Sequence, residues 1–77
     1  MDHSRIYNDI ITKRQKKPFV KGYSERHHII PVSLGGTNSY DNIVTLSARE
    51  HFICHLLLVF IHRQNRGAHA KMLHAFN

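Results

Sequence analysis

The apolar positions of residues 3–15 follow the period of an amphipathic helix. They repeat at helical spacing and form one stripe, made of Ile6, Tyr7, Ile10 and Ile11. Residues at these intervals share a face, so the stretch predicts a helix that buries a single side. Pro18 lies just beyond the stripe and ends any helix before it, because its ring removes a backbone donor and clashes with the preceding turn.

Two later stretches are typical of short strands. Residues 23–30 form the first and are closed by Pro31, and the β-branched run 42–46 forms the second. The loop between them contains Gly35 and Gly36, which permit backbone angles closed to other residues. We expect the two strands to pair in the antiparallel sense.

The clearest helix signal begins at Ser47. Glu50 follows three positions later and an apolar run comes directly after it, which matches a capping box. This pattern predicts a helix from Ala48 to about His62. The run is apolar on nearly every side, so we expect this helix to be well buried.

The last part of the chain predicts a helix end and a further helix. The polar stretch 63–67 finishes at Gly67 and is expected to be the C-terminal stop of the preceding helix. Residues 68–77 begin another helical pattern, which stops without a cap. We therefore expect the chain to be a fragment of a longer protein.

These elements predict one small α+β domain. Two short antiparallel strands are expected to pack on the 48–62 helix, with the 3–15 helix alongside. We divide the chain into an N-terminal helix and basic segment (1–22), a core (23–62) and a C-terminal helical extension (63–77).

The charge balance indicates a polyanionic partner. Eleven Lys and Arg residues against five Asp and Glu give a formal net charge of +6 with histidines neutral. This balance favours nucleic acid or an anionic membrane surface. Almost half of the basic residues lie in one stretch, made of Lys13, Arg14, Lys16, Lys17 and Lys21. The stretch is either a phosphate-contacting segment or a solvated face.

The cysteine count and the apolar runs bear on location. The single cysteine, Cys54, rules out an internal disulfide and fits a reducing compartment. The longest apolar run, residues 52–61, is interrupted by His55 and is too short to cross a bilayer. We therefore expect a cytoplasmic protein without a membrane segment, in which Cys54 is a small buried apolar residue.

Eight histidines among 77 residues are far more than an average composition would supply. His51 and His55 are four residues apart on the predicted helix, so both imidazoles can reach one ion. His27 and His28 are adjacent at a predicted strand end, where alternate side chains point to opposite faces. One of them can join the ion while the other faces a substrate. Such pairs are also common as plain surface or core residues, so the spacing alone leaves both readings open.

The joint pattern is more specific than any of its parts. The run Glu25-Arg26-His27-His28-Ile29-Ile30-Pro31 is followed by Gly35-Gly36, Asn42, Arg49-Glu50-His51 and His55. This order closely resembles the HNH nuclease motif of the ββα-metal superfamily. Residues 23 to about 60 are most similar to HNH endonucleases encoded by bacteriophages, including free-standing homing-type enzymes.

The resemblance implies a role for each matched position. His27, His51 and His55 match the ligands of one divalent metal ion, and His28 matches the general base that activates water. Asn42 matches the asparagine that pins the loop against the first strand and orients that base. The ion would be Mg²⁺ or Mn²⁺ for catalysis, and Zn²⁺ or Ni²⁺ could occupy the same site.

The resemblance also implies a substrate and products. The chain would hydrolyse phosphodiester bonds of double-stranded DNA and leave 5′-phosphate and 3′-hydroxyl ends, in the host cytoplasm if it is encoded by a phage. Glu25, often acidic in relatives, would support the site from behind the ligands. Many relatives carry Asp at the position of His27, which leaves the metal preference open. Phosphate contacts are expected from Lys13, Arg14, Lys16, Lys17, Lys21, Arg26 and Arg49.

Two other functions remain open at this point. One is a zinc module that binds nucleic acid without cutting it and uses all four motif histidines as ligands. In that case His28 would be a ligand and Asn42 would have no role. The other is a basic membrane-surface or adaptor domain with incidental histidines. The oligomeric state is not predicted by the sequence.

Overall fold

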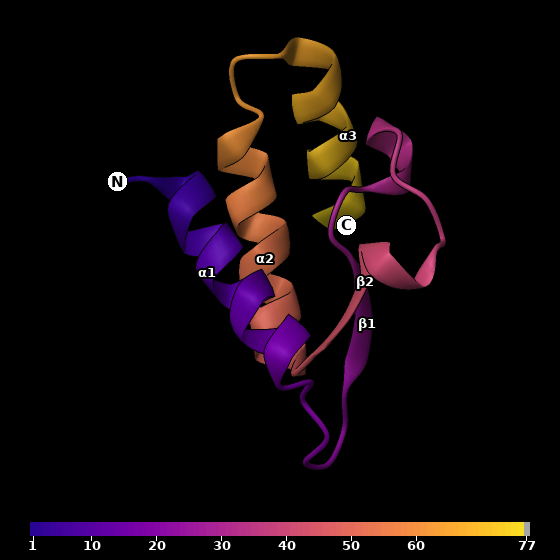
Figure 1. Cartoon of the computed structure of the whole chain (residues 1–77). Coiled ribbons are helices and arrows are strands. Elements are labelled where there is room, and N and C mark those ends of the chain that lie inside the picture. Colours follow the sequence, from indigo (N-terminus) through magenta and orange to yellow (C-terminus); the bar gives the residue numbers. More distant parts are fainter. Residues whose placement is uncertain (77) are drawn as a thin grey trace.

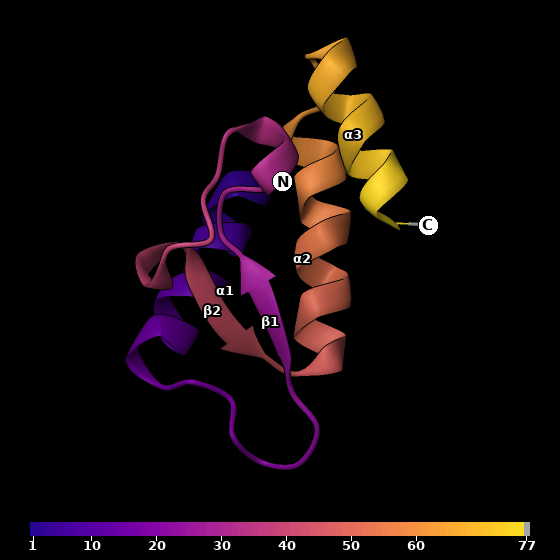
Figure 2. The same ribbon diagram turned by 90° about the vertical axis from the view of Figure 1, so that its right-hand side faces the viewer.

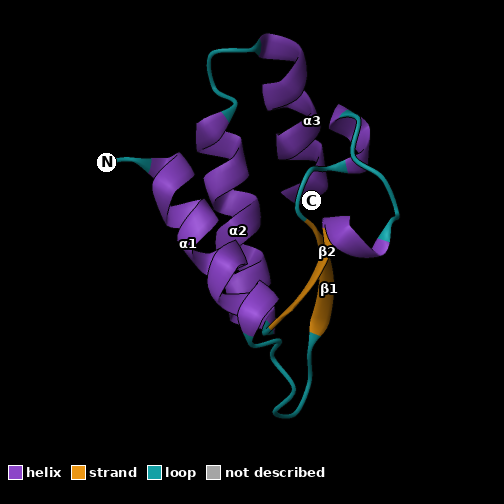
Figure 3. Ribbon diagram, viewed as in Figure 1, coloured by secondary structure: helices purple, strands orange, loops and turns teal. Residues whose placement is uncertain are grey.

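The computed structural model describes residues 1–76. It contains three helices, a two-stranded antiparallel sheet and two short 3₁₀ turns, so the predicted α+β class is confirmed. Helix α2 lies between α1 and α3, and the sheet lies beside the lower half of α2 (Figure 1; Figure 3 distinguishes helix, strand and loop). The bounds are α1 His3–Lys16, β1 Glu25–His28, η1 Val32–Leu34, η2 Tyr40–Asn42, β2 Ile43–Leu46, α2 Ala48–Ile61 and α3 Arg66–Phe76.

Helix α1 forms where the apolar stripe predicted it. Its first turn is capped by Asp2, whose carboxylate accepts a hydrogen bond of 3.0 Å from the backbone of Arg5. Its buried residues are Tyr7 and Ile11, one turn apart on the face toward α2 and the sheet. The helix ends at Lys16, two residues before Pro18.

The sheet presents two chemically different faces. Its register places His27 opposite Val44 and His28 opposite Ile43, so adjacent histidines face opposite ways. Strand β1 is shorter than the predicted 23–30, because its continuation is held by Asn42 instead of by the partner strand. The backbone N–H of Ile29 donates to the backbone oxygen of Asn42 at 2.8 Å.

The loop between the strands depends on two glycines. Gly35 has a φ of +97°, a left-handed conformation that non-glycine residues rarely adopt. Gly36 has ordinary angles, but a Cβ there would lie 1.8 Å from the backbone oxygen of Ile30. The loop therefore needs a special conformation at one glycine and the absence of a side chain at the next.

Helix α2 begins with the predicted capping box. The Ser47 side chain accepts from the backbone of Glu50 at 3.1 Å, and the Glu50 carboxylate accepts from the backbone of Ser47 at 3.0 Å. The same carboxylate binds both Nε and Nη2 of Arg14, at 2.9–3.0 Å. One side chain thus caps α2 and fastens the end of α1 to it.

Helix α3 begins earlier than predicted. It starts at Arg66, so the prediction that Gly67 stops the preceding helix is wrong. The reason is a local cap: the Asn65 side chain accepts from the backbone of Ala68 at 3.0 Å and starts a new helix immediately. Helix α2 itself ends at Ile61, one residue short of the predicted His62. The predicted last residue of the final helix lies outside the described residues.

The core lies between α1, α2, α3 and the inner face of the sheet (Figure 2). Its buried apolar residues are Tyr7, Ile11, Val44, Leu46, Cys54, Leu57, Leu58, Val59 and Met72. Cys54 is fully buried, as predicted, and burial raises the pKa of its thiol to about 11. None of the helices in residues 1–76 is long and apolar enough to cross a membrane.

Candidate functional site

Three of the predicted histidines meet between β1 and α2. His27 comes from β1, and His51 and His55 come from adjacent turns of α2. One ring nitrogen of each lies within 4.8 Å of the others. Among residues 1–76 these three form the only such group of possible metal ligands, and Cys54 is not part of it. The four-residue helical spacing has therefore placed both imidazoles toward the strand.

Glu25 fixes the orientation of His51. Its carboxylate lies 2.7 Å from Nδ1 of His51, and a carboxylate can only accept from a neutral imidazole. Nδ1 therefore carries the proton and Nε2 of His51 has the free lone pair. Hydrogen bonds from Tyr23 and then from His51 hold the pKa of Glu25 below its ordinary value, so it stays ionised. This contact is compatible with the role behind a ligand that the sequence predicts for Glu25, and that role stays a prediction.

Two of the three clustered histidines are held in their neutral, ligand-competent form. His27 is only 2% exposed, and burial together with the neighbouring His51 and His55 lowers its pKa to about 3. Burial and then His51 also lower the pKa of His55. Two imidazoles therefore remain uncharged at neutral pH and can donate lone pairs to an ion.

The donor set fits a divalent transition metal. Nε2 of His51 and Nε2 of His55 are 3.0 Å apart. Two nitrogens bound to one ion at about 2.0–2.1 Å lie roughly 2.8–3.4 Å from each other. Nδ1 of His55 is buried without a hydrogen-bond partner in the part of the chain that the structure describes. Imidazole ligands suit zinc and nickel better than magnesium or manganese, which prefer oxygen.

His28 faces away from the cluster but reaches the same hollow. We call this the histidine hollow, a concavity of about 370 Å³ lined by the three clustered histidines, His28, Arg26, residues 31–33 and, from α2 and α3, Leu58, Met72 and Ala75. Because β1 ends at His28, its side chain lies at the rim. Nε2 of His28 is 2.8 Å from the side-chain oxygen of Asn38.

Asn42 clamps the loop that follows β1. Its side-chain oxygen accepts from the backbone of Ile30 at 2.9 Å, and its amide donates to the oxygens of Ile30 and Thr37 at 3.0 and 2.8 Å. Asn42 is 8% exposed, and its three side-chain hydrogen bonds are part-buried. The geometry is that of a side chain pinning a loop against the end of the first strand.

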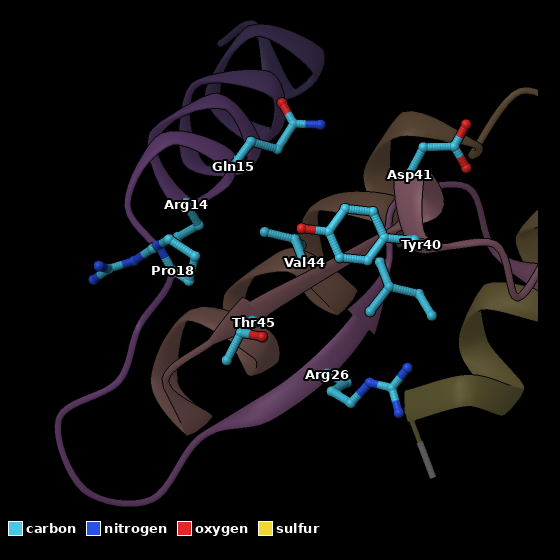
Figure 4. Close-up of a pocket in the computed structure, with 9 residues that line it drawn as sticks. Arg14, Gln15, Pro18, Arg26, Tyr40, Asp41, Val44 and Thr45 are labelled. Carbon is cyan, nitrogen blue, oxygen red and sulfur yellow. The ribbon is translucent and has the colours of Figure 1, made fainter.

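The predicted phosphate-contacting cations differ in whether an acidic side chain of the protein already binds them. Arg14 is bound by Glu50 and lies over the ring of Phe19, with its guanidinium 5.1 Å from the ring centre. A second hollow, of about 410 Å³, lies beside the strands and the end of α1 and shares Arg26 with the first (Figure 4). Of the predicted phosphate-contacting cations, those that are exposed and have no ion pair among the described residues are Lys13, Lys16, Lys17, Lys21, Arg26 and Arg49.

Two residues at the site were missed by reasoning from sequence. The hydroxyl of Tyr7 lies 2.7 Å from Nε2 of His27, and Asn38 contacts His28. Tyr7 was read only as part of an apolar stripe, and Asn38 only as part of a glycine-containing loop. A polar tip on a core-facing tyrosine is a signal that could have raised the question, because buried hydroxyls seek partners.

Comparison with known proteins places this geometry in a family. The HNH endonuclease family matches residues 16–57. "Probable mobile endonuclease D" of Enterobacteria phage T4 is 44% identical over 71 residues, which is 87% of this chain and 27% of that protein. "Probable mobile endonuclease E" of the same phage is 47% identical over 58 residues, or 75% of this chain and 41% of that protein.

The matched segment holds the whole histidine constellation. It includes the three clustered histidines, His28 and Asn42, and it excludes most of α1 and all of α3. The chain spans less than half the length of the T4 relatives just described. No solved structure matches the chain. From the family match over more than half of its residues and the identity to these relatives, the chain belongs to the HNH endonuclease family.

Proposed function

We propose that this chain is the catalytic core of a metal-dependent DNA endonuclease. The observation that carries the proposal is the shared histidine hollow, in which the three clustered imidazoles and His28 meet within a chain of the HNH endonuclease family. The T4 relatives are named probable mobile endonucleases. We infer the same class of activity for this chain, on double-stranded DNA.

His27, His51 and His55 are the residues that would hold the ion. When bound, a divalent ion neutralises charge on the phosphorus oxygens and stabilises the departing 3′ oxygen. The protein itself must keep these imidazoles uncharged and directed toward one point. Burial does the first for His27 and His55, and the α2 spacing with Glu25 behind His51 does the second.

His28 is the proposed general base. The side-chain oxygen of Asn38 can only accept, so the 2.8 Å contact places a proton on Nε2 of His28. Nδ1 is then the nitrogen with the free lone pair and takes the proton from the attacking water. Attack on phosphorus and departure of the 3′ oxygen would leave 5′-phosphate and 3′-hydroxyl ends.

Asn42 and Gly36 are proposed to hold the base in place. The Asn42 clamp fixes the backbone directly after His28, and the missing side chain of Gly36 lets its loop lie against Ile30. A general base must stay within hydrogen-bond reach of the water that it deprotonates. A fixed loop keeps His28 at the rim of the histidine hollow.

The phosphate contacts are proposed to lie on both sides of this hollow. Arg26 lines it directly. The end of α1 and the start of α2 lie at the same end of the molecule (Figures 1 and 2). Lys16 is the last residue of α1, Lys17 follows it, and Arg49 belongs to the first turn of α2. These exposed cations would position the duplex without reading its sequence. A contact from Arg14 remains a prediction, since its guanidinium is already bound by Glu50.

The non-cutting zinc module is less well supported. It requires His28 as a fourth ligand, but the group of ligand atoms within reach of one another consists of His27, His51 and His55. His28 lies on the opposite face of β1 and contacts Asn38 instead. Its position suits a group that meets the substrate.

The test is cleavage of duplex DNA with mapped ends. Supercoiled and linear DNA are incubated with the full 77-residue chain and Mg²⁺, Mn²⁺, Zn²⁺ or Ni²⁺, and the new ends are tested for 5′-phosphate by ligation. We expect nicks or breaks that require metal and can be religated. Thermal melting is run in parallel, and a chelator should lower the melting temperature. Tight metal binding with no cleavage under any condition would contradict the proposal and favour the zinc module.

A further inference from the structure

Tyr7 makes a polar contact that the nuclease mechanism above does not use. It lies on α1, outside residues 16–57, and is 5% exposed. Its hydroxyl oxygen is 2.6 Å from the backbone oxygen of Ile29 and 2.7 Å from Nε2 of His27. Both neighbours are within hydrogen-bond distance, and the hydroxyl has only one proton to share between them.

The position of that proton follows from the chemistry of the two partners. The backbone oxygen of Ile29 can only accept, and two oxygens 2.6 Å apart without a proton between them would repel each other. The hydroxyl of Tyr7 therefore donates to Ile29. The contact with His27 then requires the proton on the imidazole, so Nε2 of His27 donates to the Tyr7 oxygen.

We propose that Tyr7 is a positioning residue of the metal site, which fixes His27 in the Nε2-protonated tautomer and leaves Nδ1 as its ligand atom. The inference rests on the proposed metal site. Under this proposal, a residue of α1 helps to orient a ligand of the metal site. It also predicts that the ion binds Nδ1 of His27 and Nε2 of His51, opposite nitrogens of the two rings.

The arrangement parallels that of Glu25 and His51. In each case a partner behind the ring accepts a hydrogen bond from one protonated ring nitrogen and leaves the other nitrogen to face the cluster. The partners differ in chemistry, because Glu25 carries a charge and Tyr7 does not. Burial raises the pKa of the Tyr7 hydroxyl, so it keeps its proton. A neutral partner suits His27, which is buried more deeply than His51.

Tyr7 is held firmly enough to play this part. Its ring belongs to the core, and its hydroxyl is anchored on the backbone of Ile29, two residues beyond His27. Helix α1 is tied to α2 by the bidentate bond between Arg14 and Glu50. The hydroxyl therefore has a fixed place relative to both elements that carry the three histidines.

The first experiment reads the tautomer directly in the unaltered chain. Long-range ¹H–¹⁵N spectra of the full chain, with the His27 signals assigned by their loss in His27→Gln, are recorded with chelator and then with one equivalent of Zn²⁺. We expect a protonated Nε2 and an unprotonated Nδ1 without metal, and a shift of Nδ1 on Zn²⁺ addition. A protonated Nδ1, or Zn²⁺ bound at Nε2, overturns the inference.

The second experiment removes only the hydroxyl. Tyr7→Phe keeps the buried ring, so the fold should persist while His27 loses its orienting partner. Losing such a partner typically weakens metal binding by about 10- to 100-fold. We expect that loss in Zn²⁺ titrations, with both His27 tautomers present in the spectra. Unchanged Zn²⁺ affinity in Tyr7→Phe overturns the inference.

Two control variants separate orientation from general loosening. Tyr40→Phe removes a hydroxyl from a side chain that is 96% exposed, and should leave Zn²⁺ affinity unchanged. Ile11→Val loosens the same buried face of α1 and should lower the melting temperature more than the Zn²⁺ affinity. If Ile11→Val weakens Zn²⁺ binding as much as Tyr7→Phe does, the effect is packing and the inference fails. If the unaltered chain does not bind Zn²⁺, the proposed metal site is wrong. The tautomer of His27 measured under chelator does not depend on Zn²⁺ binding and therefore tests the role of Tyr7 by itself.

Discussion

The two faces of β1 differ in almost every property. The inner face carries Glu25 and His27, which contact α2, and His27 is almost fully buried. The outer face carries Arg26, which is exposed, and His28, which is partly buried and contacts Asn38 of the neighbouring loop. Adjacent histidines with the same chemistry thus have different surroundings. In the proposed mechanism, strand alternation separates the metal ligand, which stays dry, from the general base, which meets water and substrate.

Removing His28 from the outer face of β1, or His55 from the metal cluster that the inner face joins, should break this division most clearly. His28→Ala should lower cleavage by about 10²–10⁴-fold while Zn²⁺ affinity stays unchanged, because only the general base is lost. His55→Ala should weaken Zn²⁺ binding and cleavage together. Single-turnover cleavage and calorimetric titration measure the two effects, and His74→Ala on the exposed side of α3 is the control. Loss of metal in His28→Ala would falsify the separation of roles.

The contact of His28 with Asn38 offers a finer test of the outer face. Asn38→Ala removes the acceptor and lets His28 adopt either tautomer, so the cleavage rate should fall by roughly tenfold or more. This loss is smaller than the loss of about 10²–10⁴-fold expected when the general base itself is removed. Asn38→Asp keeps an acceptor oxygen and should restore much of the rate. Zn²⁺ affinity should be the same in both variants. Equal cleavage rates in the alanine and aspartate variants would show that the acceptor does not matter.

The inner face should make stability depend on pH. The pKa of His27 is about 3 in the folded chain and near the ordinary value of about 6.5 when unfolded. Between these values the unfolded chain binds the extra proton. Stability is therefore complete above about pH 6.5 and is lost as pH falls toward 3, with a slope of up to about 1.4 kcal/mol per pH unit for one such group. Urea unfolding under chelator measures this slope, and His27→Gln should flatten it.

Replacing the exposed cations should have the smallest effect, and it should act on DNA binding alone. Replacing Lys16, Lys17 and Lys21 by Gln should reduce the salt dependence of DNA binding by about three units of the log–log slope, and leave metal binding unchanged. Arg5→Gln changes the exposed charge at the far end of α1 and is the control. An unchanged slope in the triple variant would show that the basic stretch is only solvated.

The sequence predicted best what depends on local spacing. The stripe in α1 and the capping box of α2 each lie within a few residues, and both helices formed where these signals placed them. The opposite orientation of His27 and His28 followed from strand alternation in the same way. The meeting of the three histidines followed from the resemblance, since no local rule brings β1 to α2.

What the sequence did not predict depends on contacts between distant positions. Tyr7 reaches His27 across 20 residues, and Asn38 reaches His28 across ten. The pattern of apolar and polar positions does not reveal hydrogen bonds of this kind, because a core tyrosine counts as apolar in that pattern with or without a partner for its hydroxyl. The early start of α3 was missed for a related reason: Asn65 was read as part of a helix exit, and it caps the next helix.

The two glycines of the loop after β1 set different limits on mutation. At Gly35 the obstacle is backbone conformation, and the space around it is open, so a residue that tolerates a left-handed angle, such as Asn, is the natural substitute. At Gly36 the obstacle is volume, because even a methyl group would collide with the backbone of Ile30, which no rotamer change can move. The first position therefore tolerates selected side chains and the second tolerates none. A single methyl group at Gly36 would push apart the two backbones that the Asn42 clamp joins, and so act on His28 without touching it.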